Sequence, residues 1–355
     1  MNKTLDLVKY RWSFILFSLF IIVPGLIFIA LGGVRPSIDF TGGSSWDIFF
    51  DPARVPAGAQ VETAIKEADS QFIAELKNKQ GRNQAENDLL SQRERQNFEA
   101  VAQPSDNGLI IVRTGLIFDN TDEKGYLINA LNQRFGQANG FDPSRLGMTS
   151  TGPTLATETT LRSGMAVLAV SIGILLYLMY AFRKVSKPWR YGVCAILAML
   201  HDVLVVIGVF AILGYFFSVE VDALFVTAVL TTVGFSVHDT IVVFDRIREN
   251  QLRHPGEPFD SLVNYSLLQT LARSVVTSLT TLFTLSALYL FGGATIRNFV
   301  LALLVGILSG TFSSIFNASM LLVIWEKGEF GRLLRRLPGG KSRTKKYTKR
   351  GELNA

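Results

Sequence analysis

Three ionisable residues lie within or at the head of long apolar stretches, where a charge is costly. Asp202 and Asp239 are the acids, and Arg273 is the base. Ionisable side chains at membrane depth often mark an ion or proton pathway. Asp239 lies 18 residues after Val221, and Arg273 lies 18 residues before Phe291, where the two helices meet the outer face. At 1.5 Å per residue, each is about 27 Å below that face. The sequence therefore predicts an acid and a base at one level of a membrane.

Hydroxyl side chains recur at helical spacing around this pair. Thr232 and Ser236 precede Asp239, and Thr277 follows Arg273 by one turn. We expect two facing polar stripes that hold water, and a carboxylate that loads and releases a proton as the helices move. A static ion pair that fixes helix packing is the alternative. The second stripe continues through Thr280, Thr281 and Thr284.

Asp202 follows His201, a residue that titrates near neutrality, and lies near the middle of its stretch. Two interpretations stay open for this acid. It is a secondary proton relay, or it is a buried carboxylate hydrogen-bonded to a Ser or Thr of another helix. Small residues of the last stretch predict close helix contacts, because they let two backbones approach. They are Gly306, Gly310, Ser313 and Ser314.

Six apolar stretches must position these residues. Each is close to the roughly 20 residues that cross a hydrocarbon core. The first is interpreted as an anchor and not as a cleaved signal peptide, because it is long, contains Pro24 and lacks a small-residue cleavage site. The sequence predicts a multi-span α-helical membrane protein with six transmembrane helices. The stretches are 12–32, 163–182, 191–217, 223–244, 275–291 and 299–325.

The net charge of +6 is unevenly distributed along the chain. Basic residues gather near the N-terminus, at 183–190, at 246–253 and in the tail from 327, whereas the segment 34–160 holds more acids than bases. This pattern predicts that both termini are cytoplasmic, and it argues against a nucleic-acid partner. The single cysteine, Cys194, excludes an internal disulfide, and redox chemistry is not expected.

The segments divide the chain into four parts. We expect a cytoplasmic N-terminus with the first span at 1–33, an extracytoplasmic domain at 34–160, a membrane bundle at 161–325 and a basic cytoplasmic tail at 326–355. The tail has a second interpretation as a patch for anionic lipid.

The extracytoplasmic domain has a mixed α and β pattern. Strands are expected at 44–50 and 108–114, and helices at 61–77 and 124–135, which suggests an α+β ferredoxin-like sandwich. The polar segment 78–107 predicts a helical excursion or a mobile loop. In the bundle, residues 259–271 predict an amphipathic helix along the membrane surface.

Residues 234–250, GFSVHDTIVVFDRIREN, strongly resemble the signature of the SecF family. Two further blocks agree, IDFTGG at 38–43 and QTLARSVVTS at 269–278. The resemblance extends over residues 2–325 and is weakest at 78–107. Its signature residues here are Gly234, Asp239, Asp245, Arg246, Arg248, Glu249 and Asn250.

The resemblance implies a member of the resistance-nodulation-division superfamily that acts with SecD, each partner contributing six spans. It implies no enzyme activity, no metal and no cofactor other than protons as the coupling ion. The proton motive force would help the SecYEG channel to move unfolded preproteins across the bacterial inner membrane, with YajC a further partner. The family's proton-carrying Asp and its partners correspond to Asp239, Arg273 and Thr277.

The IDFTGG block is expected to form the turn and strand by which the extracytoplasmic domain leaves the membrane, with Asp39, Thr41, Gly42 and Gly43 as a hinge. Two rival functions are a small-molecule exporter of the same superfamily and a scaffold that conducts no ions. The sequence does not identify the dependent preproteins, the stoichiometry with SecD or the number of protons per cycle.

Overall fold

Six long helices run side by side in the computed structural model, which describes residues 5–95, 98–104, 106–117, 122–183 and 187–329. The basic tail predicted from residue 326 falls outside this range from residue 330 onward. All six helices are long and apolar enough to cross a membrane, which confirms the predicted number of spans. They are α1 (Arg11–Ala30), α6 (Pro153–Ala181), α7 (Pro188–Phe217), α8 (Ala223–Arg253), α9 (Phe259–Phe291), and a sixth built from α10 and α11.

The sixth helix is interrupted by a wide turn. After α10 (Ala294–Phe312), a π-helical segment (η4, Ser313–Asn317) leads into α11 (Ala318–Glu326). The sequence predicts one uninterrupted span here, and the π turn is a difference. Such turns insert an extra residue into a helix and often occur at functional sites.

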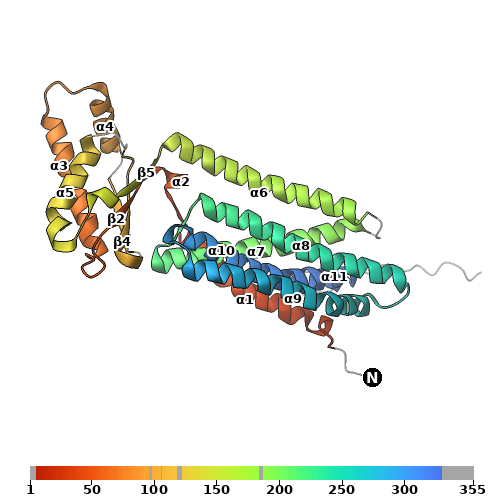
Figure 1. Cartoon of the computed structure of the whole chain (residues 1–355). Coiled ribbons are helices and arrows are strands. Elements are labelled where there is room, and N and C mark those ends of the chain that lie inside the picture. The colour runs from red at the N-terminus through yellow and green to blue at the C-terminus, as the bar shows by residue number, and fades with distance from the viewer. Residues whose placement is uncertain (1–4, 96–97, 105, 118–121, 184–186, 330–355) are drawn as a thin grey trace, which may run out of the picture.

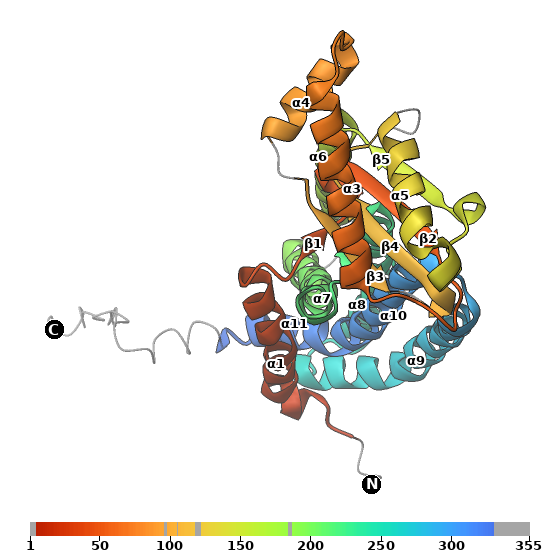
Figure 2. The same ribbon diagram turned by 90° about the vertical axis from the view of Figure 1, so that its left-hand side faces the viewer.

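The helix predicted at 259–271 is present and forms the first turns of α9, a helix of 33 residues, and in Figure 2 this part of α9 runs across the end of the bundle. At 1.5 Å per residue α9 is about 50 Å long, well beyond a hydrocarbon core of about 30 Å. Only residues 254–258 connect α8 to α9.

A separate α/β unit, here called the inserted domain (residues 43–151), lies at one end of the helices (Figure 1). Its four strands are ordered β3-β4-β2-β5, and every neighbouring pair is antiparallel. The predicted strand at 44–50 is β2 (Gly43–Phe49), and the one at 108–114 is β4 (Leu109–Thr114). The structure adds β3 (Ala100–Pro104) and β5 (Gly147–Thr151).

Two helices lie across one face of this sheet, α3 (Gly58–Asn78) and α5 (Asp122–Asn139) (Figure 2). Trp46 and Ile48 alternate along β2 and pair with Val112 and Ile110 of β4, so four apolar side chains point to the helices. The segment predicted as an excursion or loop at 78–107 holds a helix, α4 (Gln84–Arg95), together with β3. Shorter turns are η1 (Val8–Tyr10), α2 (Ile38–Thr41), η2 (Asp106–Gly108) and η3 (Pro143–Arg145).

Glycines set a close helix contact in the bundle, between α8 and α10. A Cβ atom at Gly306 would lie 2.3 Å from Cγ2 of Thr232, and one at Gly310 would lie 3.1 Å from Cβ of Ser236. This bears out the expectation that small residues of the last span permit close packing. The face of α8 that carries Thr232 and Ser236 is therefore turned toward α10.

One arginine joins the helices of the inserted domain. Arg93 of α4 forms ion pairs with Asp69 of α3, at 3.4 Å, and with Glu123 of α5. Both acids are buried, and burial raises the pKa of Glu123 to about 7 despite the guanidinium beside it. Burial also raises the pKa of Asp69. Two carboxylates share one cation, so the cluster favours a bound proton.

We expect the inserted domain to lose stability as the pH rises through about 7. A pKa that is higher in the folded protein than in the unfolded chain stabilises the fold at low pH, and this contribution disappears as Glu123 ionises. Glu123→Gln should flatten the pH dependence of thermal unfolding between about pH 5 and 8. Glu67→Gln, on the exposed Arg134 pair, is the control. An unchanged pH profile in Glu123→Gln contradicts the assignment.

We expect Gly306→Ala to destabilise the bundle by about 1–3 kcal/mol, the usual cost of overpacking. The matched control is Gly234→Ala, because a Cβ at Gly234 has nothing within 4 Å. Alanine favours a helix by about 1 kcal/mol over glycine, so the control should be neutral or stabilising. Thermal unfolding of the two purified variants in detergent measures the difference, and equal midpoints would refute the close contact.

Candidate functional site

Asp239 lies in the interior of the bundle on α8. The helix starts at Ala223, where the side chain of Asp222 accepts a hydrogen bond of 2.7 Å from the backbone N–H of Phe225 and caps the first turn. Asp239 is only 3% exposed, and its Oδ2 atom has no hydrogen-bond partner among the described residues. A buried carboxylate without a partner is costly when ionised, so it is the residue best suited to accept a proton.

The predicted contact between Asp239 and Arg273 is absent from the described residues. Arg273 is exposed on the surface of α9, and it borders a cavity of about 550 Å³ between α6, α8 and α9. Its guanidinium lies with polar residues at the end of α8, whereas Asp239 faces inward. No ion pair joins the two side chains among the described residues.

The expectation of two facing polar stripes is wrong for this chain on its own. The stripe of α8 packs on α10, as described above, and not on α9. The stripe of α9 bonds to its own backbone, with Thr277 Oγ1 donating to the carbonyl of Arg273 at 2.9 Å and Thr284 Oγ1 to that of Thr280 at 3.1 Å. Thr277, Thr280 and Thr284 are exposed on the outer surface of the helix.

Asp202 of α7 is the centre of the most complete polar cluster. Ser236 of α8 donates to its Oδ2 at 2.6 Å, Ser313 of η4 donates to the same atom at 2.5 Å, and Ser309 of α10 donates to Oδ1 at 2.7 Å. The imidazole Nδ1 of His201 lies 3.0 Å from Oδ1. Asp202 is 1% exposed, and four polar groups surround its two oxygen atoms.

This geometry supports the interpretation of Asp202 as a carboxylate bonded to hydroxyls of other helices. Ser313, expected only as a packing residue, supplies one of these hydroxyls, and the role of Ser309 was missed. A signal existed, because Ser309 and Ser313 are one helical turn apart and face the same side. The π turn that places Ser313 beside Asp202 has no such signal.

The charged end of the α8 signature builds the rim of the cavity beside Arg273. Asp245 pairs with Arg248 at 2.8 Å, and Arg246 pairs with Glu249 at 2.5 Å. Asn250 is buried and donates to Ser266 Oγ of α9 at 2.8 Å. The two ion pairs lie within α8, and the Asn250 hydrogen bond ties the end of α8 to the start of α9. The second half of the signature therefore lies at this end of α8.

The predicted hinge residues meet the first turn of α8. Asp39 Oδ2 accepts a hydrogen bond of 3.0 Å from the N–H of Ala223, and Thr41 Oγ1 donates to the carbonyl of Ser37 at 3.0 Å. Gly42 and Gly43 have φ values of 75° and 129°, a region that favours glycine. The IDFTGG block forms the short helix α2 and the start of β2, where a turn and strand were expected.

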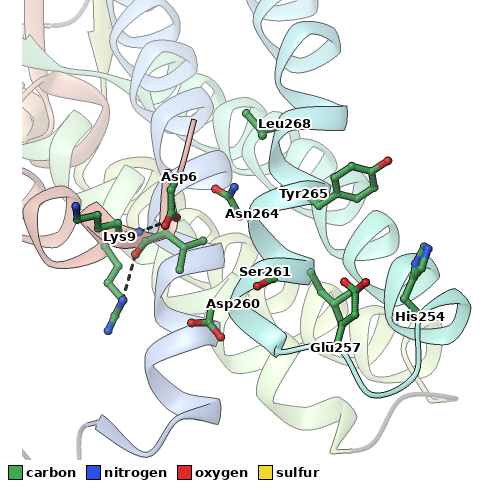
Figure 3. Close-up of a pocket in the computed structure, with 12 residues that line it drawn as sticks. Asp6, Lys9, His254, Glu257, Asp260, Ser261, Asn264, Tyr265 and Leu268 are labelled. Atoms are coloured by element: carbon green, nitrogen blue, oxygen red, sulfur yellow. Dashed lines mark hydrogen bonds between the residues drawn. The ribbon is translucent and has the colours of Figure 1, made fainter. Parts of the chain in front are cut away.

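A second groove lies at the end of the bundle away from the inserted domain, where the N-terminal turn packs on α9 (Figure 3). Asn264 holds this contact, since its Oδ1 accepts from the N–H of Leu7 at 2.8 Å and its Nδ2 donates to the carbonyl of Leu5 at 3.0 Å. Its lining includes His254, Glu257 and Asp260. None of the predicted site residues lies in this groove. Across the described chain, no group of three or more His, Cys, Asp or Glu residues could hold a metal.

Comparison with known proteins supports one family. The family model described as protein export membrane protein SecD/SecF, C-terminal, matches residues 132–328. The chain is 52% identical to the protein translocase subunit SecF of Thermobaculum terrenum over 333 residues, which are 94% of this chain and 97% of that protein. It is 40% identical to the SecF subunit of Anaerolinea thermophila, with the same coverage of each chain.

The fold agrees with a solved structure of the same family. The crystal structure of SecDF from Thermus thermophilus, a translocon-associated membrane protein, superposes with a TM-score of 0.70 and 31% identity. The match covers 92% of this chain and 39% of that longer chain. With six membrane-spanning helices and a close relative matched over nearly its full length, the chain belongs to the SecF family of protein translocase subunits.

Proposed function

We propose that this SecF-type subunit uses the proton motive force to assist preprotein export, with Asp239 as the proton carrier. The observation that carries the proposal is a carboxylate inside a membrane-spanning helix, 3% exposed, with an oxygen that no described residue bonds. Proton transfer through a potential of about 100 mV supplies roughly 2.3 kcal/mol per charge. That energy is enough to bias the diffusion of an unfolded chain. The coupling ion is the proton, and no other cofactor is proposed.

The proposal assigns SecD as the partner that completes the site. Arg273 and Thr277 are exposed on α9 at membrane depth, where lipid tails offer no hydrogen-bond partner. A second helical protein can cover them, and SecDF of Thermus thermophilus carries both names in one chain, of which this chain matches a part. In the complete assembly a shift of α9 against α8 brings Arg273 to the ionised Asp239. Protonation of Asp239 removes that attraction and releases α9.

The remaining assignments follow from charge and topology. The basic ends of the chain place both termini in the cytoplasm and the inserted domain outside the inner membrane. The strand and helix order β2-α3-β3-β4-α5-β5, with α4 as an addition, supports a ferredoxin-like inserted domain. There it would meet unfolded preproteins that leave the SecYEG channel. YajC and membrane lipid are further proposed partners.

Asp239→Asn should abolish the proton-driven component of preprotein export, because an amide cannot release a proton at neutral pH. Export by membrane vesicles, measured with and without an uncoupler, separates this component from the ATP-driven one. Co-purification with SecD should persist. The matched control is Asp245→Asn, at an exposed carboxylate two turns along the same helix, which should keep most of the proton-driven component. Export by Asp239→Asn at the wild-type rate would refute the carrier role.

Asp202→Ala should act differently, by lowering the stability of the bundle. It strands the hydroxyls of Ser236, Ser309 and Ser313, and each unsatisfied buried donor costs about 1–3 kcal/mol. Thermal unfolding in detergent measures this loss, which Asp239→Ala should not show. If Asp202→Asn keeps the thermal midpoint but loses proton-driven export, Asp202 is instead a second relay.

A further inference from the structure

The short turn between α7 and α8 (Ser218–Asp222) lies at the junction of the bundle and the inserted domain. α8 begins directly after it, and Asp239 follows Ala223 by 16 positions, about 24 Å along one helix. α7, which carries Asp202, ends directly before it at Phe217. Any displacement of either helix therefore reaches this turn.

The polypeptide that enters the inserted domain is held against the turn by backbone contacts. β1 (Arg35–Pro36) pairs in parallel with β6 (Glu220–Val221), and the N–H of Ser37 donates to the carbonyl of Val221 at 2.8 Å. Gly33 precedes β1 by two residues. It lies so close to α7 that a Cβ atom there would be 2.3 Å from the carbonyl oxygen of Ala211. Only glycine fits at this close approach of the linker to α7.

The linker alone leaves the sheet free to pivot. Gly42 lies between α2 and β2, Gly43 is the first residue of β2, and both adopt positive φ values. Glycine crosses conformational regions at little cost, so rotation here would uncouple the sheet from α8. A second set of contacts, made by the sheet itself, removes that freedom.

Two side chains of the sheet reach the turn. Arg113 of β4 forms an ion pair with Glu220, and Gln103 of β3 donates through Nε2 to the carbonyl of Ser218. The side chains of Arg113 and Glu220 are 23% and 12% exposed, so the pair is largely shielded from solvent. Breaking such a pair costs more than breaking an exposed one, because a charge is left in a poorly solvated place.

Several acidic residues lie near enough to act on the charge of the Arg113 guanidinium. Burial lowers the pKa of Arg113 to about 10, and the negative charges of Asp222, Asp39 and Asp47 oppose that effect. Arg113 therefore stays charged at neutral pH. Its ion pair with Glu220 joins the sheet to the turn before α8.

We propose that Arg113 is a positioning residue, and that its contact with Glu220 locks the inserted domain to α8 so that the two move as one body. The inference rests on the proposed function, in which a proton at Asp239 displaces α8. Without the lock the sheet would pivot at Gly42 and Gly43, and the displacement would be lost before it reached a preprotein.

The orientation of the domain can be measured directly. In full-length protein with Cys194→Ser, spin labels at Gln133→Cys on α5 and Thr227→Cys on α8 report the distance between the two bodies by pulsed electron paramagnetic resonance. We expect one narrow distance distribution in the parent protein and a broad one after Arg113→Gln. Arg113→Lys, which keeps the charge, should recover most of the narrow component. A narrow distribution in Arg113→Gln overturns the proposal.

The proton-driven component of preprotein export provides a second measurement. Arg113→Gln and Glu220→Gln should each lose most of the proton-driven component, and the double variant should be no worse than either, because both remove the same contact. Additive losses overturn the proposal. The control is Arg145→Gln, whose guanidinium lies over the Phe49 ring and makes no described contact with the turn. It should export at the wild-type rate, and an equal loss there also overturns the proposal.

The two proposals fail in different ways. If Asp239→Asn exports normally, the proton-carrier role is wrong, and the spin-label distances still decide whether Arg113 fixes the domain. If Asp239→Asn is inactive while Arg113→Gln exports normally with a narrow distribution, only the lock is wrong.

Discussion

The cost of a charge inside an apolar helix bundle governs how the spans of this protein are arranged. Asp202 meets that cost with three serine hydroxyls from α8, α10 and the π turn, so three helices are held around one carboxylate. Asp239, three residues beyond Ser236 on α8, has no hydrogen-bond partner for its Oδ2 atom in the part of the chain that the structure describes. Two acids with the same intrinsic chemistry thus have opposite environments: the carboxylate of Asp202 is hydrogen-bonded to neighbouring helices, and Asp239 is the one proposed to change its charge state.

The same hydrogen bonds explain why α8 faces α10. Gly306 and Gly310 lack the side chains that would keep α10 away from α8, and Ser236 of α8 donates to Asp202 of α7. The π turn widens the sixth helix at Ser313 and completes the carboxylate's coordination. α9 is excluded from this contact. Its arginine and threonines lie on the surface, where they suit a second protein better than lipid.

In the proposed mechanism, a movement of α8 must be transmitted to the inserted domain. α8 is a continuous rod from the buried Asp239 to the turn at residues 218–222, and the inserted domain contacts that turn through both its linker and its sheet. The hinge glycines at 42 and 43 are therefore surrounded by contacts that oppose free rotation. The IDFTGG block caps α8 through Asp39 as well as forming the entry to the sheet.

The sequence by itself determined the number of spans, the inserted domain and the family, because apolar length, charge bias and a contiguous signature are local properties. It also placed Asp239 and Arg273 at one depth, since helical rise converts residue number into height. Rotation about each helix axis is not a local property. Side-chain packing between α8 and α10 determined the rotation of α8 about its axis. As a result the predicted stripes do not face each other, and Arg273 lies on the surface. The ring of serines around Asp202 and the contact of Arg113 with Glu220 join residues that are 34 to 111 and 107 positions apart. Only the tertiary structure could decide them, because the free energy of such contacts depends on which faces meet and not on spacing along the chain.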